Sequence, residues 1–386
     1  MMSCGISGLV PFRVLPLIVT FCVALSAHAQ QDCTQASRSL RQGAELGDGT
    51  VQEEKLYRDA IQLCPGMAEA HHNLALALSK QGRLEDALAS IRKAFELKAD
   101  LSFKVVEATL SVQKGDFEGA IRLYENVLES DKKNLKCLQG LSVAYDRSAK
   151  IDKAVEVLKR ALEIDPSNVV SNYNLGVMYE RLDNLVQATS SYEKVISLDS
   201  NHFDASFHLG LIYRRLGQLS ESARTLSRAA QLRPEVADVH KALGVVYESL
   251  KDLDKAELAL RKAVSLDDGD IVSRINLGVI LINKHQENLA EQLLRQAVSL
   301  DPGNARAFSV KGWAQLELGK YKEAQESLEK AVSLDAMNAS AHNNLGVLYQ
   351  RLGKTEEARR EFETALRLNP ELNEAQRNAA KFGEAS

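Results

Sequence analysis

The residue types that catalyse reactions or hold metals are present in this sequence, but not at the spacing that such chemistry needs. H-E-x-x-H, C-x-x-C, G-x-S-x-G, G-x-G-x-x-G and a Walker phosphate-binding loop do not occur. His71 and His72 are adjacent, hence about 100° apart on a helix, and no Asp, Glu or His follows four residues on to complete a metal site. The sequence therefore predicts no catalytic residue, no metal site, no cofactor and no enzymatic activity.

Side chains suited to binding recur at a regular interval. Phe207 follows Tyr173 by 34 residues, and Arg215 follows Arg181 by the same distance. Aromatic residues combined with arginine are typical of recognition surfaces, and clustered arginines favour an acidic ligand. The predicted binding residues are Tyr173, Asn174, Arg181, Phe207, His208, Arg214, Arg215, Asn276, Trp313 and Asn344.

The elements that must position these residues are indicated by a glycine that recurs every 34 residues. Twelve residues after each of these glycines stands Ala or Ser, and seven further on a second small residue, usually Ala. Such rows of small residues indicate pairs of helices that pack closely. The glycines are Gly176, Gly210, Gly244, Gly278, Gly312 and Gly346, in phrases such as NLGVMY and HLGLIY.

These positions resemble the tetratricopeptide repeat, a 34-residue helix-turn-helix with Leu, Gly and Tyr at positions 7, 8 and 11, Gly at 15, Ala at 20 and 27 and Pro at 32. The resemblance implies an all-α, right-handed superhelical solenoid of about ten repeats that binds proteins or peptides. The predicted repeats are 34–67, 68–100, 101–134, 135–168, 169–202, 203–236, 237–270, 271–304, 305–338 and 339–372, followed by a capping helix at 373–386.

Some repeats depart from this pattern. The first has Arg41 in place of Gly and Glu53 in place of the first Ala, which predicts shortened or frayed helices that serve as an N-terminal cap. Repeats three and nine have Glu107 and Lys311 at position 7, where leucine is usual. We expect weaker packing layers at these two positions.

The faces of the first helix of each repeat follow from the helical period. Positions 4, 7, 8 and 11 form the predicted core, whereas positions 2, 6, 9 and 13, flanked by 5 and 12, form a free face that lines the groove in the family. Asn73, Asn174, Asn276 and Asn344 all lie at position 6, similar to the asparagine ladder in the peptide-binding repeats of O-linked N-acetylglucosamine transferase. The alternative is that these asparagines bond to neighbouring backbone between repeats.

Residues 1–29 read as a cleaved signal peptide, which leaves 30–386 as the mature solenoid. The segment has no acidic residue, one cation at Arg13, an apolar stretch from Val14 to Leu25 and the ending Ala27-His28-Ala29. An uncleaved anchor is the alternative. We expect a secreted or periplasmic protein with no transmembrane span after cleavage. Because its 48 Lys and Arg and 52 Asp and Glu are interspersed, nucleic acid is not expected as a partner.

Cleavage would leave Cys33, Cys64 and Cys137. Cys33 immediately precedes the first helix of repeat one and Cys64 follows the second, and those two ends of an antiparallel helix pair lie side by side. In an oxidising compartment we therefore expect a Cys33–Cys64 disulfide and a free Cys137.

Together these features predict a non-enzymatic scaffold that holds extended protein segments in its groove. The alternative is a regulatory or substrate-recruiting subunit of an envelope enzyme complex, such as one for glycosyl transfer, peptide cleavage or polysaccharide export.

Overall fold

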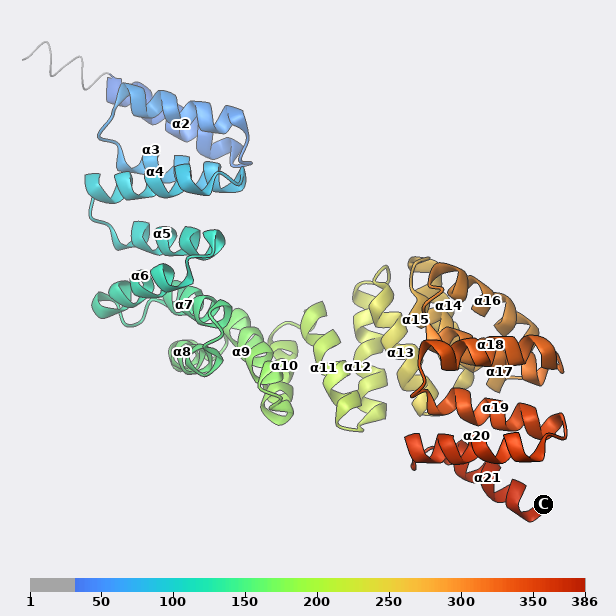
Figure 1. Cartoon of the computed structure of the whole chain (residues 1–386). Coiled ribbons are helices and arrows are strands. Elements are labelled where there is room, and N and C mark those ends of the chain that lie inside the picture. Colours follow the sequence, from blue (N-terminus) through green and yellow to red (C-terminus); the bar gives the residue numbers. More distant parts are fainter. Residues whose placement is uncertain (1–31, 386) are drawn as a thin grey trace, which may run out of the picture. The chain divides into compact units, whose positions relative to one another are not determined.

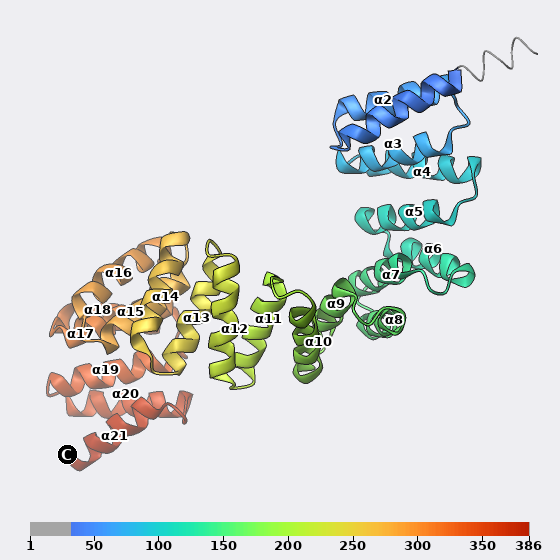
Figure 2. The same ribbon diagram turned by 180° about the vertical axis from the view of Figure 1, so that it is seen from behind.

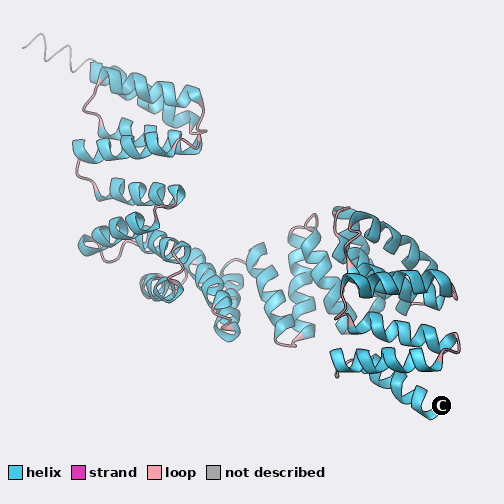
Figure 3. Ribbon diagram, in the orientation of Figure 1, coloured by secondary structure: helices cyan, strands magenta, loops and turns pink. Residues whose placement is uncertain are grey.

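A computed structural model describes residues 32–385, and in this range every regular element is a helix (Figure 1, Figure 3). The predicted all-α fold is confirmed. A helical segment at residues 32–46 precedes α2 (Val51–Leu63), α3 (Ala68–Lys80), α4 (Leu84–Leu97), α5 (Leu101–Lys114), α6 (Phe117–Ser130), α7 (Leu135–Arg147), α8 (Ile151–Ile164), α9 (Val169–Arg181), α10 (Leu185–Leu198), α11 (Phe203–Arg215), α12 (Leu219–Leu232), α13 (Ala237–Ser249), α14 (Leu253–Leu266), α15 (Ile271–Asn283), α16 (Glu287–Leu300), α17 (Ala305–Glu317), α18 (Tyr321–Leu334), α19 (Ala339–Arg351), α20 (Thr355–Leu368) and α21 (Asn373–Ala385).

The chain divides into two compact units, Met1–Asn184 and Leu185–Ser386. The division falls between α9 and α10, inside the repeat predicted at 169–202. Within each unit, every helix from α2 onward packs against the next one along the chain, which is the arrangement expected of stacked helix pairs (Figure 2).

Short polar side chains begin many of the first helices. Asn168, at position 34 of its repeat, accepts a hydrogen bond from the backbone N–H of Ser171 at 2.9 Å, and Asn338 accepts one from Ala341 at 3.0 Å. These bonds satisfy N–H groups that have no partner inside the helix. A capping residue at a constant position therefore restarts the helix at the same place in each of these repeats.

Glycine at position 8 lets the two helices of a repeat approach closely. A Cβ added to Gly210 would lie 2.6 Å from Leu226 Cγ on the second helix, and one added to Gly244 would lie 2.5 Å from Leu260 Cγ. No side chain fits at that distance. The recurring glycines found in the sequence therefore mark contacts between helices.

The core of the first helix is wider than the helical period predicts. Positions 3 and 10 are buried in repeats two to ten. Within each unit, a first helix packs against the second helices that precede and follow it along the chain, which buries both of these sides. Position 10 is occupied by Ala77, Leu110, Ala144, Met178, Ile212, Val246, Ile280, Ala314 and Leu348.

Position 4 is buried in several repeats, as predicted, at Leu138, Asn172 and Ser206 for example, but most of its residues are polar and not apolar. Asn172 and His240 occupy this position, and their side-chain N–H groups donate to the carbonyls of Pro166 at 3.2 Å and Pro234 at 3.0 Å. Gln376 bonds in the same way at the end of the chain. The carbonyl lies in the loop that precedes the helix, where it needs a partner, so a polar side chain is favoured here.

The first repeat is complete, which contradicts the prediction of shortened or frayed helices. The helical segment at residues 32–46 and the 13-residue α2 match the later helices in length. A disulfide joins Cys33 to Cys64 with a Cα–Cα distance of 5.0 Å, and Cys137 is free and buried. Both cysteine predictions are confirmed, and the disulfide joins the two ends of the helix pair. Cys33, expected just before the first helix, instead lies within the helical segment at residues 32–46.

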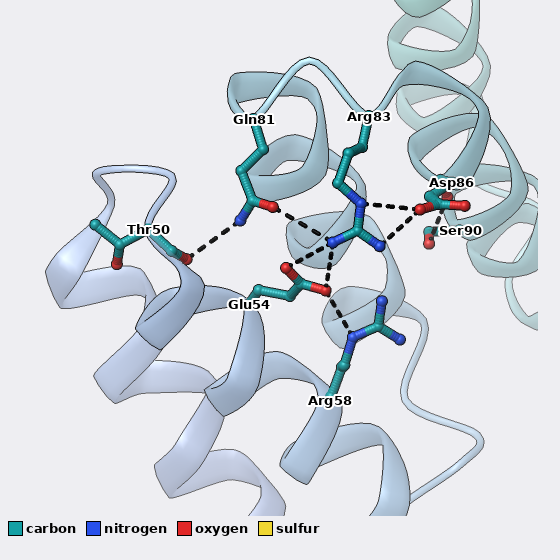
Figure 4. A network of polar contacts seen from close by, with 7 residues as sticks. All are labelled: Thr50, Glu54, Arg58, Gln81, Arg83, Asp86 and Ser90. Carbon is teal, nitrogen blue, oxygen red and sulfur yellow. Dashed lines mark hydrogen bonds and ion pairs between the residues drawn. The ribbon is translucent and has the colours of Figure 1, made fainter.

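A polar network joins the first repeat to the second (Figure 4). Arg83 Nη1 on the α3–α4 turn bonds to Glu54 on α2 at 2.9 Å, and Arg58 Nε bonds to the same carboxylate at 2.8 Å. Burial acts to raise the pKa of Glu54, but hydrogen bonds from Arg58 and Arg83 outweigh it, so the pKa lies below its usual value. Gln81 Nε2 also donates to the backbone carbonyl of Thr50.

The predicted signal peptide, residues 1–29, lies outside the described residues, and so do Cys4 and Cys22. Along residues 32–385, the helices are each too short or too polar to cross a membrane.

The candidate binding face of the first helices

In each unit, side chains on successive first helices meet along one side. Ser79 Oγ on α3 donates to Gln113 on α5 at 2.8 Å, and Arg351 on α19 pairs with Glu317 on α17 at 3.2 Å. These residues lie at positions 12 and 13. We call the surface formed by positions 5, 6, 9, 12 and 13 the first-helix face.

An apolar row runs along this face at position 9. Leu76 and Val143 are 39% and 37% exposed, and the row's other apolar members are half-buried against the cores. A line of partly exposed apolar side chains with polar neighbours is a composition suited to docking a polypeptide. The row of unit 1 consists of Leu76, Val143 and Val177, and the separate row of unit 2 consists of Leu211, Val245, Val279, Trp313 and Val347.

Sequence reasoning placed position 9 on the free face but selected only Trp313 from it. Its recurrence was readable in the sequence, because the position is apolar in every repeat from two to ten except repeat three, which has Thr109. The predicted binding residues are all polar or aromatic, so they leave out this row of valines and leucines.

In unit 1, the predicted residues Tyr173, Asn174 and Arg181 lie on α9, and the first two are half-buried. Arg181 forms an ion pair with Asp146 on α7. The positive charge that was expected to attract an acidic ligand is therefore already balanced by a carboxylate of the neighbouring repeat.

In unit 2, the predicted residues Phe207 and His208 are half-buried on α11 and belong to a cluster of rings. Phe207 stacks on Phe203 with 6.0 Å between ring centroids, and His208 stacks on Tyr192 at 5.6 Å. These contacts hold both rings against the repeat.

On the same helix Arg214 is half-buried and Arg215 exposed. The predicted residues of α9 and those of α11 thus belong to different units. Their action as one site stays a prediction.

Asn276 supports the structural alternative for the asparagines at position 6. It is 6% exposed, and its Oδ1 accepts a hydrogen bond from Arg306 Nη2 of the next repeat at 2.8 Å. The partner is a side chain and not the backbone, but the bond still joins two repeats.

Trp313 and Asn344 are the predicted residues that the structure brings together. They line a pocket of about 270 Å³ between α17, α19 and α21 in unit 2. The side chains around it are Trp313, Leu316, Glu317, Asn343, Asn344, Val347, Arg351, Glu374, Arg377, Asn378 and Lys381.

Three asparagines in this pocket are connected. Asn378 Nδ2 donates to Asn343 Oδ1 at 3.0 Å, and Asn343 Nδ2 donates to Asn344 Oδ1 at 3.3 Å. Asn343 is 3% exposed, whereas Asn344 and Asn378 are half-buried. The sequence prediction missed Asn378 because α21 was treated as a cap, although it continues the repeat register and places Asn378 at position 6. It missed Asn343, at position 5 of α19, because only aromatic residues were selected at that position.

A second hollow, of about 440 Å³, lies in unit 1 between α6, α7 and α8. Tyr145 on its wall donates to Glu125 of the preceding repeat at 2.6 Å, and Tyr213 donates to Glu193 in the same way in unit 2. Because the bond recurs, we interpret it as a tie between repeats and not as a feature of a binding site. The described part of the chain holds no group of three or more His, Cys, Asp or Glu residues able to bind a metal.

Three family descriptions match the chain. Residues 168–382, more than half of the sequence, match the C-terminal domain of cilia and flagella-associated protein 70. Residues 111–174 and 56–89 match two descriptions of the tetratricopeptide repeat.

Solved structures of repeat proteins are similar over part of the chain. YrrB, described as a TPR protein with an unusual peptide-binding site, is 24% identical with a TM-score of 0.45, covering 48% of this chain and 96% of its own. A MamA protein is 26% identical with a TM-score of 0.42, and the match covers 44% of this chain and 92% of the MamA chain. MamA from Desulfovibrio magneticus RS-1 is 24% identical with a TM-score of 0.42, and the match covers 44% of this chain and 95% of the MamA chain. No curated protein matches the chain.

Proposed function

This chain belongs to the tetratricopeptide-repeat proteins, in the family of the cilia and flagella-associated protein 70 C-terminal domain, and from that premise we propose that it is an exported, non-enzymatic scaffold that binds extended segments of other proteins. The binding surface is the first-helix face. Its apolar row at position 9 is the observation that carries this proposal.

The arrangement of the row suits an extended ligand. Successive first helices repeat one set of positions, so a bound segment meets an apolar side chain and polar neighbours again at each repeat. In unit 2, Val245 and Val279 are half-buried in the row, which supplies apolar contact area at little cost in side-chain entropy.

Export is proposed from the composition of residues 1–29, and the Cys33–Cys64 disulfide supports it. Disulfides persist in oxidising compartments and are rare in the cytosol. Sequencing the N-terminus of the protein isolated from the cell envelope or the medium tests this part. A start at Gln30 is expected, and a retained Met1 in a protein confined to the cytosol would contradict it.

Photo-crosslinking in living cells tests the binding face. We would place a photoreactive phenylalanine analogue at Val245 or Val279 and, as a matched control, at Leu258, which is 72% exposed on α14. Crosslinks to the row are expected to map to extended segments of partner proteins, and synthetic peptides of those segments should bind the purified chain. Crosslinks from Leu258 alone would contradict the proposal.

A further inference from the structure

We propose that the pocket between α17, α19 and α21 is a peptide subsite for an apolar side chain next to an acidic residue in an extended segment. This inference rests on the proposed function and assigns a ligand chemistry to one place on the first-helix face. Hydrogen-bond polarity, apolar surface and charge each contribute to the argument.

The three connected asparagines give the pocket one donor end and one acceptor end. Because Asn378 donates to Asn343 and Asn343 donates to Asn344, the Nδ2 group of Asn344 and the Oδ1 atom of Asn378 remain at opposite ends of the chain of amides. Reversing every amide would exchange the two ends without removing either. An extended backbone offers the matching pair, a carbonyl to accept and an N–H to donate.

The apolar part of the pocket is formed by Trp313, Leu316 and Val347. An indole ring supplies a large rigid contact area and loses little conformational freedom on binding. The volume of about 270 Å³ is enough for one aliphatic side chain together with its own peptide group, but not for a folded element.

The charges around the pocket favour an acidic neighbour. Glu317 and Arg351 form an ion pair and balance each other. The remaining charged groups, Arg377 and Lys381 against Glu374, all lie on α21 and leave one net positive charge. A carboxylate next to the bound apolar side chain would face this excess of positive charge.

Trp313 is the one tryptophan of the sequence, so its fluorescence reports on this pocket alone. We would titrate the full mature chain with the blocked peptide Ser-Ser-Leu-Asp-Ser-Ser and follow tryptophan emission. A saturable change is expected. Replacing the leucine of the peptide by serine should weaken binding at least about fivefold. Replacing its aspartate by lysine should also weaken it, by a factor that shrinks as salt is added.

A pair of variants tests the amide chain. Asn344→Leu keeps the branched shape of the side chain but removes its amide, the donor end included, so we expect at least about tenfold weaker binding of the same peptide carrying fluorescein, measured by anisotropy. Asn288→Leu changes an exposed asparagine on the second helix α16, outside the pocket and the first-helix face, and should leave the affinity unchanged. Equal helicity of the two variants by circular dichroism confirms that both fold.

Several results would overturn the inference. If the peptide binds but neither Asn344→Leu nor tryptophan emission responds, the subsite is wrong while binding of extended segments survives. If none of the three peptides binds, the assigned ligand chemistry is wrong, although crosslinking to the row can still support the scaffold. A short sugar, chitotriose, serves as a probe of a different ligand class. If chitotriose changes the tryptophan emission and no peptide does, the pocket is a sugar site. If, in addition, no partner protein crosslinks to the apolar row at position 9, the proposed function fails as well.

Discussion

Glu107 and Lys311 replace leucine at position 7, and each contacts a different kind of side chain. Arg92 of the preceding repeat donates to Glu107 at 2.6 Å, so an ion pair substitutes for an apolar contact. Lys311 lies over the ring of Phe308 at 5.7 Å, and burial lowers its pKa below the usual lysine value. The lower pKa shows that the protein interior disfavours the charged form of Lys311.

Replacing Lys311 by leucine should therefore stabilise repeat nine. The change restores the residue found at position 7 in most repeats and removes a desolvated charge, so we expect the free energy of unfolding to rise by about 1 kcal/mol at neutral pH. Urea unfolding followed by circular dichroism measures the effect. As a control, Lys322→Leu on the exposed start of α18 should change stability little.

The stabilisation should also depend on pH. The folded pKa of Lys311 lies below the unfolded value of about 10.4, so above the folded pKa the unfolded chain binds more protons and the stability of the natural protein rises with pH. The advantage of Lys311→Leu is then largest at neutral pH and shrinks as the pH approaches 10. An advantage that is constant between pH 7 and 10 would show that desolvation of the ammonium group is not its cause.

At the scale of the helix pair, the turn within repeats two to ten ends the first helix with a left-handed residue at position 15. The backbone N–H of position 16 bonds to the carbonyl of position 11, as from Lys150 to Tyr145 and from Gln218 to Tyr213, both at 2.8 Å. Glycine occupies position 15 in five of these repeats, and Ala149, Asp183, Lys251 and His285 occupy it in the others with φ between 56° and 63°.

Ala149→Gly should stabilise the fourth repeat, because it removes the steric cost of a Cβ in the left-handed conformation. After allowing for the greater freedom of glycine in the unfolded chain, we expect a gain of about 0.5–1 kcal/mol. Gly217 has φ 74° and open space where a Cβ would lie. The reverse change, Gly217→Ala, should therefore lower the free energy of unfolding by a similar amount, through backbone strain alone. Urea midpoints moving in the same direction for both would contradict this account.

The disulfide should stabilise mainly the helix pair that it closes. Its 31-residue separation predicts about 3.7 kcal/mol from the entropy of the unfolded chain. In the double variant Cys33→Ser with Cys64→Ser, hydrogen exchange should quicken at residues 32–63 and change little beyond α6. Cys137→Ser, in repeat four, serves as the control. Titration of the unfolded, unreduced mature protein should find one thiol, and finding three would refute the pairing.

At the scale of the whole molecule, each repeat packs against its neighbours along the chain, so the effect of a core mutation should fade with distance in sequence. Leu294 on α16 is fully buried and lies against Gly278 of the same repeat. Leu294→Ala should cost about 2–5 kcal/mol locally. Hydrogen exchange should quicken across residues 271–318 and remain unchanged at residues 68–130. Equal loss of protection at both ends would show that the chain unfolds as one cooperative body.

Local chemistry explains how much of this protein could be predicted from its sequence. The 34-residue period, the closely packed glycine at position 8 and the Cys33–Cys64 pair all depend on spacing along the chain, and the structure agrees with each of them. The side chains of a helix repeat every 3.6 residues, and the ends of an antiparallel pair must meet, so these features need no knowledge of distant contacts.

What only the tertiary structure decided is which side chains on the first-helix face bond to other repeats. The period of a single helix cannot show that Asp146 forms an ion pair with Arg181 or that Arg306 donates a hydrogen bond to Asn276. Nor can it show that position 10 is buried on a side of the helix away from the predicted core. Each of these outcomes depends on residues about thirty positions away on a neighbouring repeat. For the same reason the pocket at Trp313 became visible only when α21 was in place beside α19.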